Sequence, residues 1–237
     1  MVMVAEFCSS HLHEKVFEFW EAQYSMDTSI GTMEAILTKA FQYVDDLVAE
    51  TFDENVGSTA VVVLVTHTHL ITANCGDSRA VLSRGGEAIP LSVDHKPDVS
   101  EERSRIESLG GLVLDYPCPW VYGILAMSPA IGMCIVGTYM NLILHPWVIP
   151  IPEVRCVERA MDDECVIIAT DGLWDMVSSD ETARIATHVL PTRRGRGGSK
   201  IAVEVAAVHL MKLAIKRGSS DNISVIVADL KSPQPMV

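Results

Sequence analysis

Apolar residues recur at helical spacing through the first fifty positions of the chain. From residue 4 to about residue 21 they return every three or four positions, which predicts a helix with one apolar face. A second stretch, from about residue 32 to residue 50, has the same period and predicts a second amphipathic helix. The chain is therefore expected to begin with two helices that each bury one side.

After residue 57 the pattern changes to short apolar runs that are rich in β-branched residues. Runs at 59–66, 70–74 and 79–83, separated by turns, predict an antiparallel meander of strands. Before residue 160 the other predicted elements are extended chain at 88–91 and 112–126, a charged helix at 100–109 that ends at Gly110-Gly111, and a strand at 154–159. After it come an acidic turn at Asp162-Asp163-Glu164, a helix at 179–189 with Ser179 or Asp180 as its cap, a basic loop at 192–199, a helix at 200–216 and a last strand at 223–230.

The five apolar residues from Cys165 to Ala169 predict a buried strand that ends just before Asp171 and Gly172. A carboxylate at the end of a buried strand has a rigid support and can face a metal ion or a substrate. The same Asp-Gly pair is also common in plain turns. From the local pattern alone, both interpretations remain open.

No charged residue occurs between Val121 and Leu144, a length that could cross a membrane. Pro129, Gly132 and Asn141 interrupt the run, and no basic cluster flanks it. We therefore expect a buried segment or an insert here and no membrane span.

Composition narrows the classes of partner and compartment. The 237 residues carry a net charge of −13, so nucleic acid is not expected as a partner. Six scattered cysteines without a Cys-x-x-Cys pair favour a reduced, intracellular protein, in the cytoplasm or the nucleus.

Seven stretches occur in an order that resembles the metal-dependent protein serine/threonine phosphatases of the 2C type, in particular their plant branch. One stretch alone is weak evidence, but seven in order are specific. The stretches are Val56-Gly57-Ser58-Thr59-Ala60, Ala73-Asn74-Cys75-Gly76-Asp77-Ser78-Arg79-Ala80-Val81-Leu82, Leu91-Ser92-Val93-Asp94-His95-Lys96-Pro97, Arg105-Ile106-Glu107 with Gly110-Gly111, Gly123-Ile124-Leu125-Ala126-Met127-Ser128, Ala169-Thr170-Asp171-Gly172-Leu173-Trp174-Asp175, and Ser219-Ser220-Asp221-Asn222-Ile223-Ser224-Val225.

The resemblance implies an α+β fold in which two packed antiparallel β-sheets are flanked by α-helices, as one domain over residues 1–237. It also implies hydrolysis of phosphoserine and phosphothreonine in phosphoprotein substrates by a water activated at a centre of two Mg²⁺ or Mn²⁺ ions. By motif, Asp171 and Asp221 match metal ligands, and Asp77 matches a ligand of a further, more weakly held metal. Carboxylates suit such hard cations.

The chain departs from the family pattern in three places. It begins at the helix that follows the family's Asp-Gly-His-Gly-Gly motif, so we expect an N-terminally truncated domain with weak metal binding and much reduced catalysis. An atypical apolar insert is expected at about 133–145, before a loose tail at 231–237. Tyr116 stands where plant hormone co-receptors have tryptophan, and Trp120 where arginine is usual, which disfavours a hormone-receptor partnership.

These departures leave two functions open. One is a phosphatase with impaired activity, and the alternative is a catalytically inactive relative that binds partners or phosphoproteins. We expect a monomer in either case.

Overall fold

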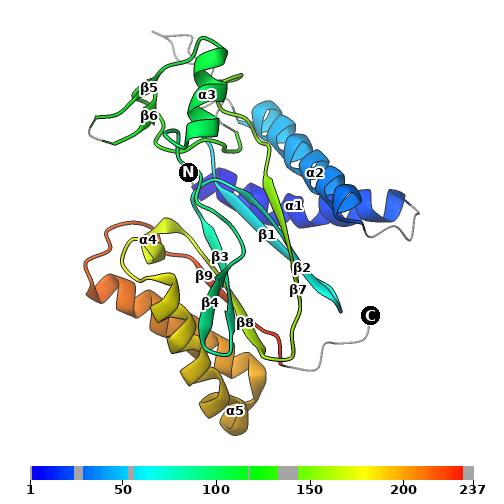
Figure 1. Cartoon of the computed structure of the whole chain (residues 1–237), viewed down its shortest axis with the longest axis vertical. Helices are drawn as coiled ribbons and strands as arrows, with labels where there is room; N and C mark the ends of the chain where they lie inside the picture. The colour runs from blue at the N-terminus through cyan, green and yellow to red at the C-terminus, as the bar shows by residue number, and fades with distance from the viewer. Residues whose placement is uncertain (1, 24–28, 53–55, 117, 133–143, 232–237) are drawn as a thin grey trace. The chain divides into compact units, whose positions relative to one another are not determined.

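The computed structural model describes residues 2–23, 29–52, 56–116, 118–132 and 144–231, and these fall into two compact units (Figure 1). The first unit comprises Met1–Val62, Ala73–Asp77 and Asp94–Val154, and the second comprises Val63–Thr72, Ser78–Val93 and Arg155–Val237. Assignment of residues 1–237 to one domain stays a prediction.

Five helices and nine strands make up the described chain. The helices are α1 (Val2–Ala22), α2 (Ile30–Thr51), α3 (Ser100–Ser108), α4 (Asp171–Trp174) and α5 (Ser179–Lys216). The strands are β1 (Ala60–Val65), β2 (His69–Cys75), β3 (Arg79–Arg84), β4 (Glu87–Pro90), β5 (Val113–Leu114), β6 (Trp120–Val121), β7 (Glu153–Glu158), β8 (Asp163–Ala169) and β9 (Val225–Asp229).

In the first unit, α1 and α2 pack against each other through the apolar faces that the sequence predicts. Aromatic side chains cross the pair, with the Phe19 and Tyr43 rings 5.9 Å apart in an edge-to-face arrangement. The Ser29 hydroxyl accepts a hydrogen bond from the Thr32 backbone N–H and caps the start of α2. The two predicted N-terminal helices are thus confirmed.

A second apolar cluster of the first unit surrounds α3. Ile106 is fully buried there with Val121 and Leu144. The extended chain predicted at 112–126 is present only as the two-residue strands β5 and β6, which pair in an antiparallel ladder. The other described residues of that segment form turns, bends and irregular chain, with an isolated bridge between Val121 and Leu125 and with Tyr122 and Gly123 at positive φ.

The second unit contains a four-stranded antiparallel sheet in the order β4-β3-β8-β9. β8 lies between β3 and β9, and the burial of Cys165, Val166, Ile167 and Ala169 explains why this run carries no charge. α5 packs along this sheet, and its buried alanines and leucines meet Val81, Ile167 and Val227 (Figure 1). The strand predicted from Cys165 to Ala169 is thus confirmed as part of β8.

Three local predictions in the second unit are wrong. Asp162-Asp163-Glu164 was expected as an acidic turn, yet Asp163 begins β8 and is 2% exposed, because Arg84 Nε donates to its Oδ1 at 2.6 Å. The cap of the following helix is Ser178, whose hydroxyl accepts from the Glu181 N–H. Two helices are present within α5, as predicted, and a kink at the non-helical Gly198 separates them, but residues 192–197 continue the first helix where a basic loop is predicted.

β1, β2 and β7 form a three-stranded sheet in the order β1-β2-β7, and the strands predicted at 59–66, 70–74 and 154–159 are confirmed. With helices and antiparallel sheets together, the chain has the α+β fold class that the sequence predicts.

The uncharged run between Val121 and Leu144 gives no membrane span in the described part of the chain, where no helix has the length and apolar character to cross a bilayer. Most of the predicted insert, residues 133–143, lies outside the described residues. Leu144, near its end, is fully buried in the core around α3. The predicted tail also lies outside the description, except for Lys231.

Candidate active site

Asp171 stands where the central strand β8 gives way to a helical turn. β8 ends at Ala169, Thr170 keeps an extended backbone, and Asp171 is the first residue of α4. Its Oδ1 accepts a hydrogen bond from the Gly172 N–H at 2.9 Å, which fixes the side chain over the turn. Asp171 therefore follows the end of a buried strand, as predicted, and the sheet that contains β8 supports it.

Asp221 lies in the loop that joins α5 to β9. Its side chain is exposed, and its Oδ1 accepts from the Asn222 N–H at 2.6 Å. The loop is held at its base by Arg217, at the end of α5, which donates to the Met176 carbonyl at 3.0 Å and to both Glu181 carboxylate oxygens. The Arg217 guanidinium lowers the pKa of Glu181 below its usual value. This ion pair fixes the point from which the Asp221 loop departs.

The loops that carry Asp171 and Asp221 are joined directly by hydrogen bonds. The Thr170 hydroxyl donates to the Asn222 carbonyl at 3.0 Å and accepts from the Ser224 N–H at 3.1 Å. The Ser219 hydroxyl donates to the Gly172 carbonyl at 2.7 Å. The structure thus joins two loops whose predicted ligands, Asp171 and Asp221, are fifty positions apart in the chain.

Glycine at position 172 allows this close approach. A Cβ at residue 172 would overlap the carbonyl oxygen of Asn222. Gly172 is therefore needed because the Asn222 backbone lies against it. A plain Asp-Gly turn would not by itself explain this requirement.

Trp174 anchors the Asp171 turn on its other side. Its indole Nε1 donates to the Ala169 carbonyl at 2.8 Å, and the guanidinium carbon of Arg79 lies 5.1 Å from the ring centroid. Arg79 also donates to the Ser179 hydroxyl at 3.1 Å, and it pairs with Ala169 in the β3–β8 ladder. The turn is held by a cation–π contact as well as by the sheet.

Asp77 belongs to the first unit and is described there. It follows β2, is 4% exposed, and receives a hydrogen bond from the Lys96 ammonium at 2.5 Å. The sequence places both residues in motifs but does not predict their pairing. In this structure, the carboxylate matched to an additional metal is compensated by a lysine.

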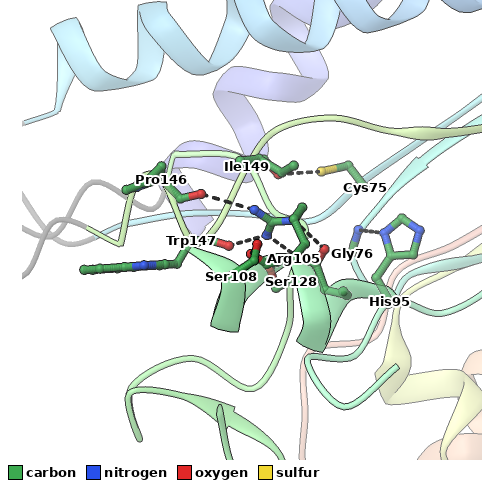
Figure 2. Close-up of polar contacts among 10 residues, drawn as sticks. Cys75, Gly76, His95, Arg105, Ser108, Ser128, Pro146, Trp147 and Ile149 are labelled. Carbon is green, nitrogen blue, oxygen red and sulfur yellow. Dashed lines mark hydrogen bonds and ion pairs between the residues drawn. The ribbon is translucent and has the colours of Figure 1, made fainter. Parts of the chain in front are cut away.

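The turn before Asp77 is tied to the loop that carries Lys96. The Gly76 N–H donates to His95 Nδ1 at 3.2 Å, as Figure 2 shows, and the His95 N–H donates to the Gly76 carbonyl. Gly76 has φ +116°, and a Cβ there would overlap Thr59. The predicted glycine-containing turn thus has a conformational reason for its glycine.

The motif that begins at Arg105 has a structural role in this fold. Figure 2 shows its guanidinium directed at the carbonyls of Pro146 and Trp147, and it also forms two 2.7 Å bonds with Glu102. The Ser128 hydroxyl donates to the same Glu102 carboxylate. These contacts hold the segments on either side of residues 133–143 against α3.

The donor chemistry at the Asp171 and Asp221 loops fits part of a divalent-cation centre. Two carboxylates on adjoining loops suit a hard cation that prefers oxygen ligands. Within the residues that the structure describes, no three His, Cys, Asp or Glu side chains gather as a metal-binding cluster. These loops would therefore supply two protein ligands and leave the rest of the coordination to other groups.

Solved structures show the same fold. A Caenorhabditis elegans sex determining protein superposes with a TM-score of 0.77 at 22% identity, over 95% of this chain and 52% of that one. A phosphatase from Toxoplasma gondii has a TM-score of 0.70 at 24% identity, over 94% of this chain and 79% of that one. The fold class is thus one found in phosphatases.

Sequence comparison places the chain more closely. The family described as protein phosphatase 2C matches residues 1–223. Protein phosphatase 2C 50 of Oryza sativa is 41% identical over 96% of this chain, and protein phosphatase 2C 56 of Arabidopsis thaliana is 40% identical over 96% of it. The chain belongs to the protein phosphatase 2C family, as the ordered motifs predict.

The chain spans 66% of the length of the rice protein and 55% of that of the Arabidopsis protein. The metal-ligand roles of Asp171, Asp221 and Asp77 stay predictions. Two residues that the structure adds are Thr170 and Lys96, which the sequence places in motifs without a role. Each lies next to, or contacts, a predicted ligand.

Proposed function

We propose that this chain is a protein serine/threonine phosphatase that hydrolyses phosphoserine and phosphothreonine in proteins with Mg²⁺ or Mn²⁺ as cofactor. The family assignment supports the class of reaction. The observation that carries the proposal is the pair of aspartates, Asp171 and Asp221, on loops joined through Thr170. Carboxylates held on rigid loops are the groups that this chemistry needs from the chain.

Asp171 and Asp221 would hold the cations. The chemistry that bound Mg²⁺ or Mn²⁺ supplies in such a centre is a water of lowered pKa and compensation of charge on the phosphoryl oxygens. The chain orients the two carboxylates through their bonds to the Gly172 and Asn222 backbone N–H groups. Those bonds use one oxygen of each aspartate.

Phosphate release from a phosphothreonine peptide in the presence of Mn²⁺ tests this function. We expect release by the wild-type chain and its loss in Asp171→Ala and in Asp221→Ala, because each change removes a cation ligand. Asp175→Ala is a matched control, since this exposed aspartate is in the same motif and is not assigned a metal role. Wild-type release no greater than that of Asp171→Ala would reject catalysis by this chain.

A second function, binding of phosphoproteins or other partners without turnover, is favoured by one specific observation. The carboxylate of Asp77 is already compensated by Lys96. Such a chain would retain a phosphatase-like surface without a complete catalytic centre. Retained binding of a phosphoprotein with no Mn²⁺-dependent release would support this function, and release that Asp221→Ala abolishes would exclude it.

We also propose that the protein acts as a monomer inside the cell, in the cytoplasm or the nucleus. The support for the compartment is the scattered cysteines, of which Cys8, Cys75 and Cys165 are buried thiols. Microscopy of a fluorescent fusion tests the compartment, and light scattering of the purified chain tests the oligomeric state. Secretion, or a dimeric mass, would contradict the respective proposal.

A further inference from the structure

The Thr170 hydroxyl is the point at which the two aspartate loops meet. It donates to the Asn222 carbonyl at 3.0 Å and accepts from the Ser224 N–H at 3.1 Å, so one side-chain atom engages both ends of the turn after Asp221. The Thr170 N–H continues the link by donating to the Ser224 carbonyl at 3.2 Å. The Thr170 hydroxyl therefore satisfies one backbone acceptor and one backbone donor of the loop that carries Asp221.

This link reaches the Asp221 carboxylate through one peptide unit on each side of Asn222. The Asn222 carbonyl is held by Thr170, while the Asn222 N–H donates to Asp221 Oδ1 at 2.6 Å. A shift of Asn222 would therefore reorient the Asp221 carboxylate. On the other loop, Thr170 directly precedes Asp171, whose carboxylate is fixed by Gly172.

Hydrogen bonds join the two loops on both sides of Asp221. The Ser219–Gly172 bond holds the beginning of the Asp221 loop, before the aspartate. The Thr170 hydroxyl holds Asn222 and Ser224, which follow the aspartate.

We propose that Thr170 is a positioning residue that sets the relative orientation of Asp171 and Asp221 for divalent-cation binding. The proposal rests on the proposed function for the identity of the two ligands. Thr170 acts through the two aspartates and does not itself contact the cation.

Substitutions that separate the hydroxyl from the shape of the side chain test the role. Thr170→Val keeps the β-branch and loses both bonds, whereas Thr170→Ser keeps the hydroxyl. Thr182→Val is the matched control, because Thr182 is fully buried in the same unit and its Oγ1 has no hydrogen-bond partner among the described residues. The readout is Mn²⁺ affinity, measured from the electron paramagnetic resonance signal of free Mn²⁺.

Thr170→Val should weaken Mn²⁺ binding by about 10- to 100-fold, the usual effect of losing a group that orients a metal ligand. Thr170→Ser should recover most of the affinity, and Thr182→Val should bind as the wild type does. Equal affinity of Thr170→Val and the wild type would overturn the proposal, as would equal loss in the serine and valine variants. If Thr170→Val does not fold, Thr170→Ala at a lower temperature takes its place against Thr170→Ser.

Phosphate release by the same proteins separates this proposal from the proposed function. A wild-type chain that binds Mn²⁺ but releases no phosphate rejects the proposed function and leaves the role of Thr170 standing if the valine variant binds weakly. Release by a Thr170→Val variant with unchanged Mn²⁺ affinity rejects the role of Thr170 alone. A wild-type chain that binds no Mn²⁺ rejects the positioning role outright.

Discussion

Asp45, on α2, is a partly buried carboxylate whose surroundings disfavour its charged form. Burial raises its pKa above the usual value, the neighbouring Asp46 adds to the rise, and the Gly132 N–H and His145 oppose it. The Gly132 N–H donates to Asp45 Oδ1 at 2.5 Å. An uncharged acceptor of the same shape would therefore satisfy this donor without the cost of a buried charge.

Asp45→Asn should stabilise the chain at neutral pH. Because the folded pKa is raised, the folded state favours the protonated carboxyl, and the wild type loses stability as the pH rises through that pKa. The advantage of the asparagine variant should therefore be largest above the raised pKa and should shrink as the pH falls below it. Urea unfolding at several pH values measures this, and a pH-independent difference between the two chains would contradict it.

Thr182 illustrates a buried polar group without compensation. Its side chain is fully buried on α5, and its hydroxyl has no hydrogen-bond partner among the described residues. Thr182→Val should raise the free energy of unfolding by about 1 kcal/mol, because it removes a desolvated hydroxyl and keeps the shape. Thr187→Val is the contrasting variant, since the Thr187 hydroxyl is hydrogen-bonded to that of Ser83 at 2.7 Å, and it should destabilise. Urea titrations that rank the two variants the other way would disprove this assignment.

At the scale of elements, α5 shows how tertiary contacts override a local pattern. Its glycine- and arginine-rich middle predicts a loop, yet α5 (Ser179–Lys216) consists of two helices that meet directly at a kink, where Gly198 has φ +83° and ψ 171°. Buried residues on both sides of the kink, such as Leu190 and Ala202, belong to the same core. Burial of both halves compensates for the weak helix propensity between them.

Gly198→Ala should destabilise the chain by about 1–3 kcal/mol, because a side chain rarely adopts this backbone conformation. Space is not the cause, since among the described residues no atom beyond the adjoining helix backbone lies within 4 Å of a Cβ built there. Gly31→Ala is the matched control on α2, with equally open space and helical φ, and it should stabilise by about 0.5 kcal/mol. Thermal and urea unfolding of both variants measure the difference, and a neutral Gly198→Ala would show that the kink is not required.

The order of strands in the four-stranded sheet is also a tertiary outcome. β8 pairs with β3, although almost eighty residues separate them, and with β9. The apolar run of β8 predicts that it is buried on both faces. The strands that pair with β8 could not be predicted from the sequence pattern. Periodicity and turn residues report only on the local direction of the chain.

At the scale of the whole molecule, stability should be linked to divalent cations if the proposed function holds. Mn²⁺ at a hundred times its dissociation constant should raise the free energy of unfolding by about 2.7 kcal/mol. Chelation with EDTA should remove this gain, and Asp171→Ala should abolish it. Thermal unfolding with and without Mn²⁺ measures the effect, and an equal gain in the alanine variant would mean that the cation binds elsewhere.

The amino-acid sequence by itself determined most of the helices and strands, the family, and the two aspartates proposed as ligands. These follow from local periodicity and from motifs whose order is written along the chain. The α+β fold class followed from the same motifs and is confirmed.

Only the tertiary structure decided which groups face one another. It buried Asp163 against Arg84, paired Asp77 with Lys96, and joined the Asp171 and Asp221 loops through the Thr170 hydroxyl. Each of these contacts links residues at least nineteen positions apart. Their geometry depends on the packing of the whole sheet and helix layer, which no local pattern encodes.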